Sequence, residues 1–85
     1  IEINPDDSDA YLGRGFLKAE LFDYEEAIDD YSKAIQLNPE DDKSYYYRGL
    51  SKLELEDDNG ACQDLKKAME LGNLDALTII NEFCD

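Results

Sequence analysis

The sequence predicts an all-α fold of about five helices, arranged as stacked helix-turn-helix units. The first observation is a repeat with a period of 34 residues, which places Tyr11 and Tyr45 at matching positions. The second is that apolar residues recur at helical spacing inside each unit. The third is that small residues, Gly15 and Gly49 among them, recur where helices would approach closely. These observations indicate an array in which each unit buries its apolar face against its neighbours.

Identical residues at matching positions define the units. The identical pairs include Tyr11 and Tyr45, Arg14 and Arg48, Gly15 and Gly49, Lys18 and Lys52, Glu20 and Glu54, Leu21 and Leu55, Asp23 and Asp57, Ala27 and Ala61, Asp30 and Asp64, Lys33 and Lys67, Ala34 and Ala68, and Leu37 and Leu71. Ile1, Asn4 and Pro5 likewise match Ile35, Asn38 and Pro39. We therefore expect residues 1–5 to end a preceding repeat and residues 74–85 to form a C-terminal closing helix. The two units between them are residues 6–39 and 40–73.

The first unit is expected to contain helices at about Ser8–Phe22 and Tyr24–Leu37. Asn38-Pro39 ends the second of these helices, since proline cannot continue a helix and restricts the residue before it. Another Asn-Pro pair, at positions 4–5, predicts that residues 1–4 are the last turn of a preceding helix.

Local signals mark the turn and the packing inside the first unit. Asp23, with Glu26 three residues later, is typical of a capping box in which aspartate replaces serine or threonine. Gly13 and Gly15 would each cost about 1 kcal/mol relative to alanine inside a helix. Gly15 has a packing reason, because its missing side chain lets the partner helix, which carries the small residue Ala27, come close.

The second unit is expected to contain helices at about Asp42–Leu55 and Asp58–Leu71, with Gly72 as a natural stop. A fifth helix at about Leu74–Phe83 lies outside the repeat pattern. Its simplest role is to cover the apolar end of the array, as repeat proteins require. The alternative is that it is the first helix of a degenerate third repeat.

The charge of the chain restricts its partners. Eight basic and 22 acidic residues give a net charge of −14, which argues against nucleic acid and against an anionic membrane surface. This charge permits a basic partner. The simpler interpretation is that the acidic residues cover solvated faces and helix starts and have no partner. The chain has no apolar run long enough to span a membrane and no leader pattern at its start. These features indicate a soluble protein and slightly favour the cytoplasm.

Nothing in the sequence indicates catalysis, a cofactor or a metal. The chain has two cysteines and no histidine, and the cysteines lack the spacing of a zinc site. Buried free thiols are the favoured interpretation of Cys62 and Cys84, and a disulfide that pins the last helix is the alternative. We therefore expect a protein that is not an enzyme.

These residues resemble the tetratricopeptide repeat (TPR) family. The family's key positions fall on Tyr11, Arg14, Gly15, Ala27, Tyr31, Ala34 and Pro39 in the first unit, and on Tyr45, Arg48, Gly49, Ala61, Leu65 and Ala68 in the second. The resemblance covers about residues 1–72. It departs at Arg14 and Arg48, where the family usually has leucine, and at the end of the second unit, which lacks the proline. It implies a short right-handed superhelix, or α-solenoid.

The resemblance also implies where a partner would bind. In TPR arrays, the first helices of successive units line a concave groove that takes extended peptides or helices. The matching positions here are Asp9, Leu12, Phe16, Ala19 and Glu20 in the first unit, and Lys43, Tyr46, Leu50, Leu53 and Glu54 in the second. Six of these residues are apolar, which is unusual for a soluble surface. The pattern predicts a scaffold or adaptor module whose partner is an apolar peptide or helix with basic flanks.

Two further expectations concern the groove. The first is an alternative function: a structural spacer or a weak homo-oligomer, in which the protein itself fills the groove. The second concerns the family members that bind chaperones. These members hold a peptide carboxylate with Lys, Arg and Asn. The corresponding positions here are Leu12, Phe16 and Tyr47, so this specialisation is expected to be absent. Arg14 and Arg48 occupy a helix-packing position, where we expect them to pair with carboxylates.

Overall fold

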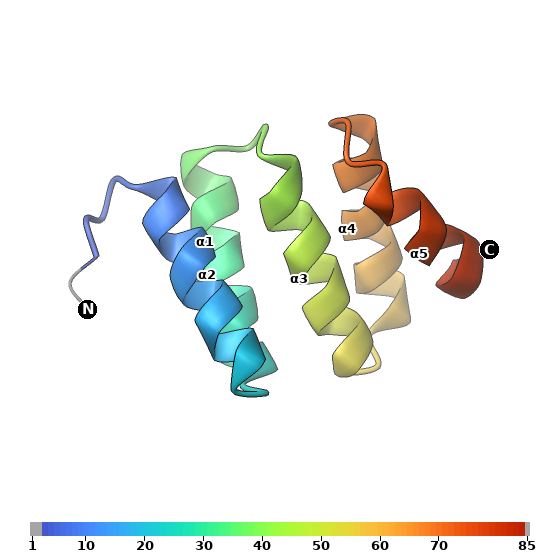
Figure 1. The fold of residues 1–85 in the computed structure, drawn as a ribbon, viewed down its shortest axis with the longest axis horizontal. Coiled ribbons are helices and arrows are strands. Elements are labelled where there is room, and N and C mark those ends of the chain that lie inside the picture. Colours follow the sequence, from blue (N-terminus) through green and yellow to red (C-terminus); the bar gives the residue numbers. More distant parts are fainter. Residues whose placement is uncertain (1–2, 85) are drawn as a thin grey trace.

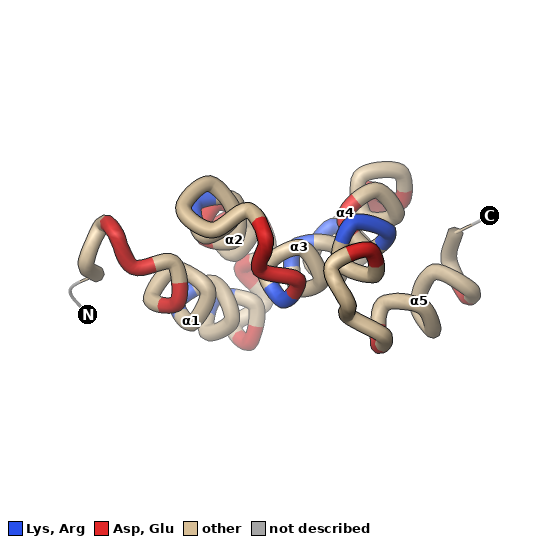
Figure 2. Tube along the Cα trace, turned by 90° about the horizontal axis from the view of Figure 1, so that it is seen from above, with Lys and Arg blue, Asp and Glu red and all other residues tan. Residues whose placement is uncertain are grey.

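Five helices in two layers make up the described part of the chain. The structure is a computed structural model, and it describes residues 3–84. The helices are α1 (Ser8–Glu20), α2 (Tyr24–Leu37), α3 (Asp42–Glu54), α4 (Asp58–Glu70) and α5 (Asp75–Phe83). Figure 1 shows α1 with α2, and α3 with α4, as two helical hairpins that stand side by side. Seen from above, α1, α3 and α5 form one layer and α2 and α4 the other (Figure 2). The predicted all-α repeat fold is confirmed.

Helices α1 and α3 end two residues and one residue before their expected ends because the chain turns into the left-handed region. Phe22 and Glu56, at matching positions, have φ angles of 63° and 65°. The amide of Asp23 then donates to the carbonyl of Lys18 at 2.9 Å, and the amide of Asp57 repeats this bond to Lys52. This pattern is a Schellman motif, which usually places glycine at the left-handed position. Gly72 supplies that residue, with a φ of 104°, after α4.

Two predictions near helix starts are wrong. Residues 1 and 2 of the expected preceding helix lie outside the described residues, but Ile3 and Asn4 are not helical. The predicted capping box also does not form, since the side chain of Asp23 accepts no cap hydrogen bond. Instead, a hydrogen bond with Asp23, together with that carboxylate's charge, raises the pKa of the Glu26 carboxyl.

Small residues on α2 and α4 let the two layers approach closely. The buried core consists mainly of alanines, with one large side chain in each unit; its residues are Ala27, Tyr31, Ala34, Ala61, Leu65, Ala68 and Ala76. A Cβ atom on Gly15 would lie 2.7 Å from the ring of Tyr31, and one on Gly49 would lie 2.9 Å from Leu65. The packing role predicted for these glycines is therefore confirmed.

A buried carboxylate joins the two helices of each hairpin. Asp30 is 4% exposed and accepts two hydrogen bonds from the guanidinium of Arg14, at 2.9 and 2.7 Å. The ammonium of Lys18 lies 3.3 Å from the same carboxylate. Burial alone would raise the pKa of the Asp30 carboxyl, but the hydrogen bonds from Arg14 and Lys18 outweigh it and lower the pKa below its usual value.

The second hairpin repeats this arrangement and extends it. Asp64, also 4% exposed, accepts two hydrogen bonds of 2.7 Å from Arg48, and Lys52 lies 3.0 Å away. Arg48 also donates to the hydroxyl of Ser32 at 3.1 Å, which ties the second hairpin to α2 of the first. The predicted pairing of the repeat arginines with carboxylates is therefore confirmed. The arginines of these pairs stand at the position where the resembled family usually has leucine.

The two cysteines form a disulfide, so the favoured interpretation of free thiols is wrong. Cys62 on α4 is bonded to Cys84, directly after α5. Both cysteines are half-buried, and the sequence spacing did not show that the chain returns to α4 after α5. The bond closes a loop across 22 positions of sequence and holds the end of α5 against α4. Such a cross-link stabilises chiefly by restricting the unfolded chain.

Two glycines on one helix provide a matched test of this packing. Gly13→Ala should raise the free energy of unfolding by about 1 kcal/mol, because nothing lies within 4 Å of the added Cβ and alanine favours a helix. Gly15→Ala should lower it by about 1 kcal/mol or more, because overpacking against Tyr31 outweighs the same helix preference. Urea unfolding followed by circular dichroism measures both changes. Equal stabilisation by the two substitutions would contradict the close approach of α1 and α2.

Candidate functional site

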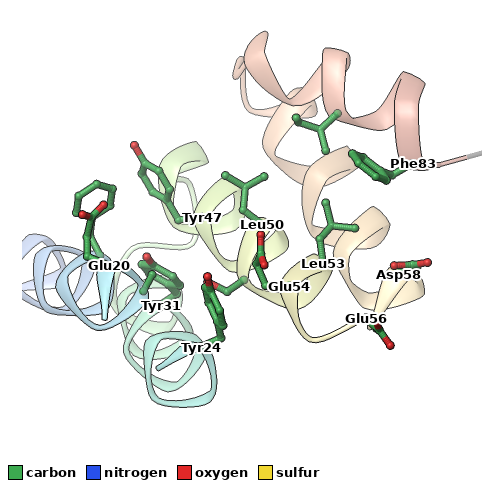
Figure 3. Close-up of a pocket in the computed structure, with 14 residues that line it drawn as sticks. Glu20, Tyr24, Tyr31, Tyr47, Leu50, Leu53, Glu54, Glu56, Asp58 and Phe83 are labelled. Atoms are coloured by element: carbon green, nitrogen blue, oxygen red, sulfur yellow. The ribbon is translucent and has the colours of Figure 1, made fainter. Parts of the chain in front are cut away.

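A groove opens on the face formed by α1, α3 and α5. Its volume is about 720 Å³, and its lining comes from all five helices and from the turn between α3 and α4. The lining residues are Phe16, Ala19, Glu20, Tyr24, Tyr31, Tyr47, Leu50, Ser51, Leu53, Glu54, Glu56, Asp58, Ile79 and Phe83. Figure 3 shows Glu20, Tyr31 and Tyr47 on the side of the first hairpin and Phe83 on the side of α5, with Leu50 and Leu53 between them. The groove is thus built by elements that are far apart in the sequence.

Aromatic rings form one side of the groove, with Tyr47 of α3 at their centre. The Tyr47 ring lies 5.5 Å from that of Phe16 in an edge-to-face arrangement. It lies 6.1 Å from the ring of Tyr31 with an interplanar angle of 26°, and 5.4 Å from the ring of Tyr46. These are favourable separations for aromatic pairs. Tyr47 therefore joins α3 to both helices of the first hairpin and holds the aromatic wall in place.

The charged residues of the groove lining are all acidic: Glu20, Glu54, Glu56 and Asp58. Glu20 and Glu54 are the last residues of α1 and α3 and occupy matching repeat positions. Since the four repeat cations Arg14, Lys18, Arg48 and Lys52 pair with the buried aspartates, they turn toward the second layer. The groove face is left with negative charge around an apolar floor.

The structure brings six of the ten predicted groove residues together. Those that line the groove are Phe16, Ala19, Glu20, Leu50, Leu53 and Glu54. Lys43 and Tyr46 instead line a second hollow of about 380 Å³ between the start of α3 and the start of α5. Asp9 and Leu12 line neither hollow. The assignment of all ten as ligand-binding residues stays a prediction.

Several groove residues were not predicted from the sequence. Tyr24 and Tyr31 lie on α2, the second helix of the unit, whereas the predicted groove positions were all on first helices; Figure 3 shows their hydroxyls directed toward the groove. Ile79 and Phe83 come from α5, which has no repeat partner to indicate its direction. Tyr47 had a usable signal, because three consecutive tyrosines on a helix cannot all face the core.

Helix α5 forms a wall of the groove and does not fill it. Its buried residue Ala76 packs near Leu65 and Ala68 of α4, with Tyr46 and Leu53 of α3 beside them. Figure 2 places α5 in the layer of α1 and α3, where a third hairpin would have its first helix. Both expected roles of this helix, a closing helix and the start of a degenerate repeat, agree with that position.

The described residues offer no arrangement for metal binding. Across residues 3–84, no group of three or more His, Cys, Asp or Glu side chains is placed to hold a metal ion. In the same part of the chain, no helix combines the length and apolar character needed to cross a membrane.

The family comparison agrees with the repeat seen in the fold. The family model described as tetratricopeptide repeat matches residues 8–41, which comprise α1, α2 and the turn to α3. Residues 8–41 are therefore similar to the tetratricopeptide repeat family, and the second hairpin repeats their residue pattern. The two hairpins and α5 form the repeat fold that the sequence predicts. A sequence search of curated proteins finds no match.

Solved TPR structures share this fold. One is described as the first TPR of Spaghetti (RPAP3) bound to the HSP90 peptide SRMEEVD; it is 23% identical, with a TM-score of 0.90, and the match covers 94% of this chain and 65% of that one. The other is the second TPR domain of human RPAP3 in complex with the HSP70 peptide SGPTIEEVD; it is 26% identical, with a TM-score of 0.89, and the match covers 96% and 70%. The chain therefore spans about two thirds of the length of these domains.

Tyr31 makes the groove wall sensitive to alkaline pH. Burial, with the charges of Tyr47, Asp30 and Glu20, raises the pKa of its hydroxyl to about 12, against about 10 in an unfolded chain. The pKa of Tyr31 is higher in the folded protein than in the unfolded chain. The contribution of Tyr31 to the free energy of unfolding is therefore complete below about pH 10 and is lost as the pH rises toward 12.

We therefore expect Tyr31→Phe to remove part of the alkaline loss of stability. Urea unfolding between about pH 9 and pH 12 should show the wild-type protein losing stability faster than the variant, by up to about 1.4 kcal/mol per pH unit. Parallel curves for the two proteins would contradict the burial of a neutral Tyr31 hydroxyl.

Proposed function

We propose that this chain is a protein–protein interaction module that binds a peptide or a helix of a partner in the groove. The observation that carries the proposal is the open groove of about 720 Å³, with an apolar floor contributed by the first-layer helices. Concave sites of this size and lining are typical of ligand binding. The TPR structures with the same fold hold peptides, which supports a peptide as the class of ligand. We propose no catalytic role for the chain.

Charge defines which partners fit. The lining of the groove carries four carboxylates and no basic residue, so we infer a partner with an apolar core and basic flanks. The peptides in the compared structures carry the acidic ending EEVD, and such an ending would be repelled here. Nucleic acid and anionic membranes are unsuitable partners for the same reason, given the net charge of −14.

The compartment is better argued from the disulfide than from the composition. Thiols are kept reduced in the cytosol, whereas disulfides persist in oxidising surroundings. The bond between Cys62 and Cys84 therefore favours an oxidising compartment over the cytoplasm that the sequence slightly favours.

Groove residues can be changed without touching the core, which gives a direct test. Peptides are selected from a random display library on the folded protein and resynthesised, and their affinities are measured by titration calorimetry. Phe16→Glu with Leu50→Glu should weaken binding at least about tenfold, because two carboxylates would stand in the apolar floor. Leu17→Glu with Leu77→Glu is the matched control, since both leucines are exposed and lie outside the groove lining. Equal affinities for both double variants would contradict the proposal, provided circular dichroism shows both folded.

A homo-oligomer is the second candidate function, and exposed apolar residues favour it. Leu21 and Phe22 are more than three-quarters exposed at the end of α1, and Leu74 is similarly exposed before α5. Light scattering behind a sizing column distinguishes the two functions. A monomer leaves the groove open to a partner, whereas a stable dimer that Phe16→Glu with Leu50→Glu converts to a monomer would show that the groove is occupied by a second copy.

A further inference from the structure

The acids at one end of the groove have no cationic partner within the protein. In the described residues 3–84, the ion pairs involve neither Glu20 nor Glu54. Both carboxylates line the groove. The cations nearest to them in sequence, Lys18 and Lys52, are already committed to Asp30 and Asp64. Glu20 and Glu54 can therefore pair with a cation of a ligand without breaking a buried ion pair.

Tyr31 brings a hydroxyl to the same end of the groove. Its side chain is 1% exposed, yet its hydroxyl has no hydrogen-bond partner among the described residues. Figure 3 shows that hydroxyl directed toward the groove, beside the hydroxyl of Tyr24. Among the described residues no buried side-chain oxygen lacks a partner, so the Tyr31 hydroxyl reaches the groove surface, where it can bond to a group that enters the groove.

The two tyrosines lie between the two carboxylates. In Figure 3, Tyr31 and Tyr24 occupy the space between Glu20 on one side and Glu54 on the other. The Glu20 carboxylate is close enough to Tyr31 to contribute to its raised pKa, together with burial. Aromatic rings attract cations through their faces, and the attraction is stronger away from bulk water. The Tyr31 ring is covered, but Tyr24 is only half-buried, so its ring, with acids on both sides, is suited to an organic cation.

We propose that this end of the groove is a subsite for an arginine side chain of the bound partner. We call it the arginine subsite; its residues are Glu20, Tyr24, Tyr31 and Glu54. The proposal rests on the proposed function, since it specifies one side chain of the peptide that the groove binds. The Phe16, Leu50 and Leu53 side chains next to it take the apolar residues of the same peptide.

Arginine fits this subsite better than lysine does. The planar guanidinium stacks on tyrosine rings, whereas an ammonium is a compact, strongly hydrated point charge. Its several N–H donors can bond to a carboxylate and a hydroxyl together, and Glu20 and Tyr31 offer one of each. The guanidinium is also more weakly hydrated, so it enters an aromatic groove at a lower desolvation cost. An acidic side chain at this place would face two unpaired carboxylates.

The test uses the whole chain and defined peptides. Peptides selected on the folded protein from a random display library are resynthesised with acetylated and amidated ends. Each is compared with versions in which arginine is replaced by citrulline, lysine or glutamate, and affinity is measured by calorimetry at low and high salt. Citrulline keeps the shape of arginine and removes its charge, so it isolates the electrostatic part of the interaction.

The expected results follow from the chemistry of the arginine subsite. Selected peptides should share an arginine, and citrulline should weaken binding about tenfold or more. The affinity of the lysine peptide should lie between those of the arginine and citrulline peptides, and the glutamate peptide should bind most weakly. Added salt should weaken the binding of the arginine peptide most. In the variant Glu20→Gln with Glu54→Gln, the preference for arginine over citrulline should fall to about twofold or less. The control Glu40→Gln with Glu82→Gln removes the same charge from exposed positions outside the groove lining and should keep the preference.

Three outcomes would overturn the proposal, and they separate it from the proposed function. Selected peptides without arginine that still lose affinity in the variant Phe16→Glu with Leu50→Glu would overturn the arginine subsite and leave the interaction module in place. Stronger binding of the peptide SGPTIEEVD, which has no arginine, than of any arginine peptide would do the same. A search that yields no peptide whose binding depends on the groove would overturn both.

Discussion

The buried carboxylates Asp30 and Asp64 are the constraint on which the rest of the structure depends. Each one sits between the two helices of its hairpin and holds an arginine and a lysine from the facing helix. An unpaired charge at such a position would be strongly destabilising, whereas a pair with several hydrogen bonds is tolerated. The arginine therefore cannot leave its site without exposing a buried charge. This fixes how α1 faces α2 and how α3 faces α4.

The same pairing determines the character of the groove. Since the repeat arginines and lysines are held toward the second layer, the first layer presents carboxylates and apolar groups to solvent. Glycines at 15 and 49 bring the layers close enough for Tyr31 to reach the groove wall and contact Tyr47. The disulfide of Cys62 and Cys84 then holds α5 as the opposite wall. Stability and ligand preference thus have a common origin in where the charges are placed.

The sequence predicted the repeat and failed where the chain leaves it. Helix positions, the packing role of Gly15 and the pairing of Arg14 followed from periodicity and residue type, which depend on local geometry. The disulfide was missed because a contact across α5 depends on how that helix docks, and one sequence gives no register for it. Tyr31 was assigned to the core, and it does pack there. Only the three-dimensional structure shows that the tip of such a long side chain emerges on the groove.

The most direct test of the central claim is the pKa of the Asp30 carboxyl, measured by carbon-13 NMR titration of the side chain. The account predicts a pKa below about 3.9, the value for an unfolded chain, because hydrogen bonds from Arg14 and Lys18 outweigh burial. The stability from this pair should then be present at neutral pH and be lost as the pH falls through that pKa. A pKa above the unfolded value would show a buried carboxyl that is not held by these cations, and would contradict the account.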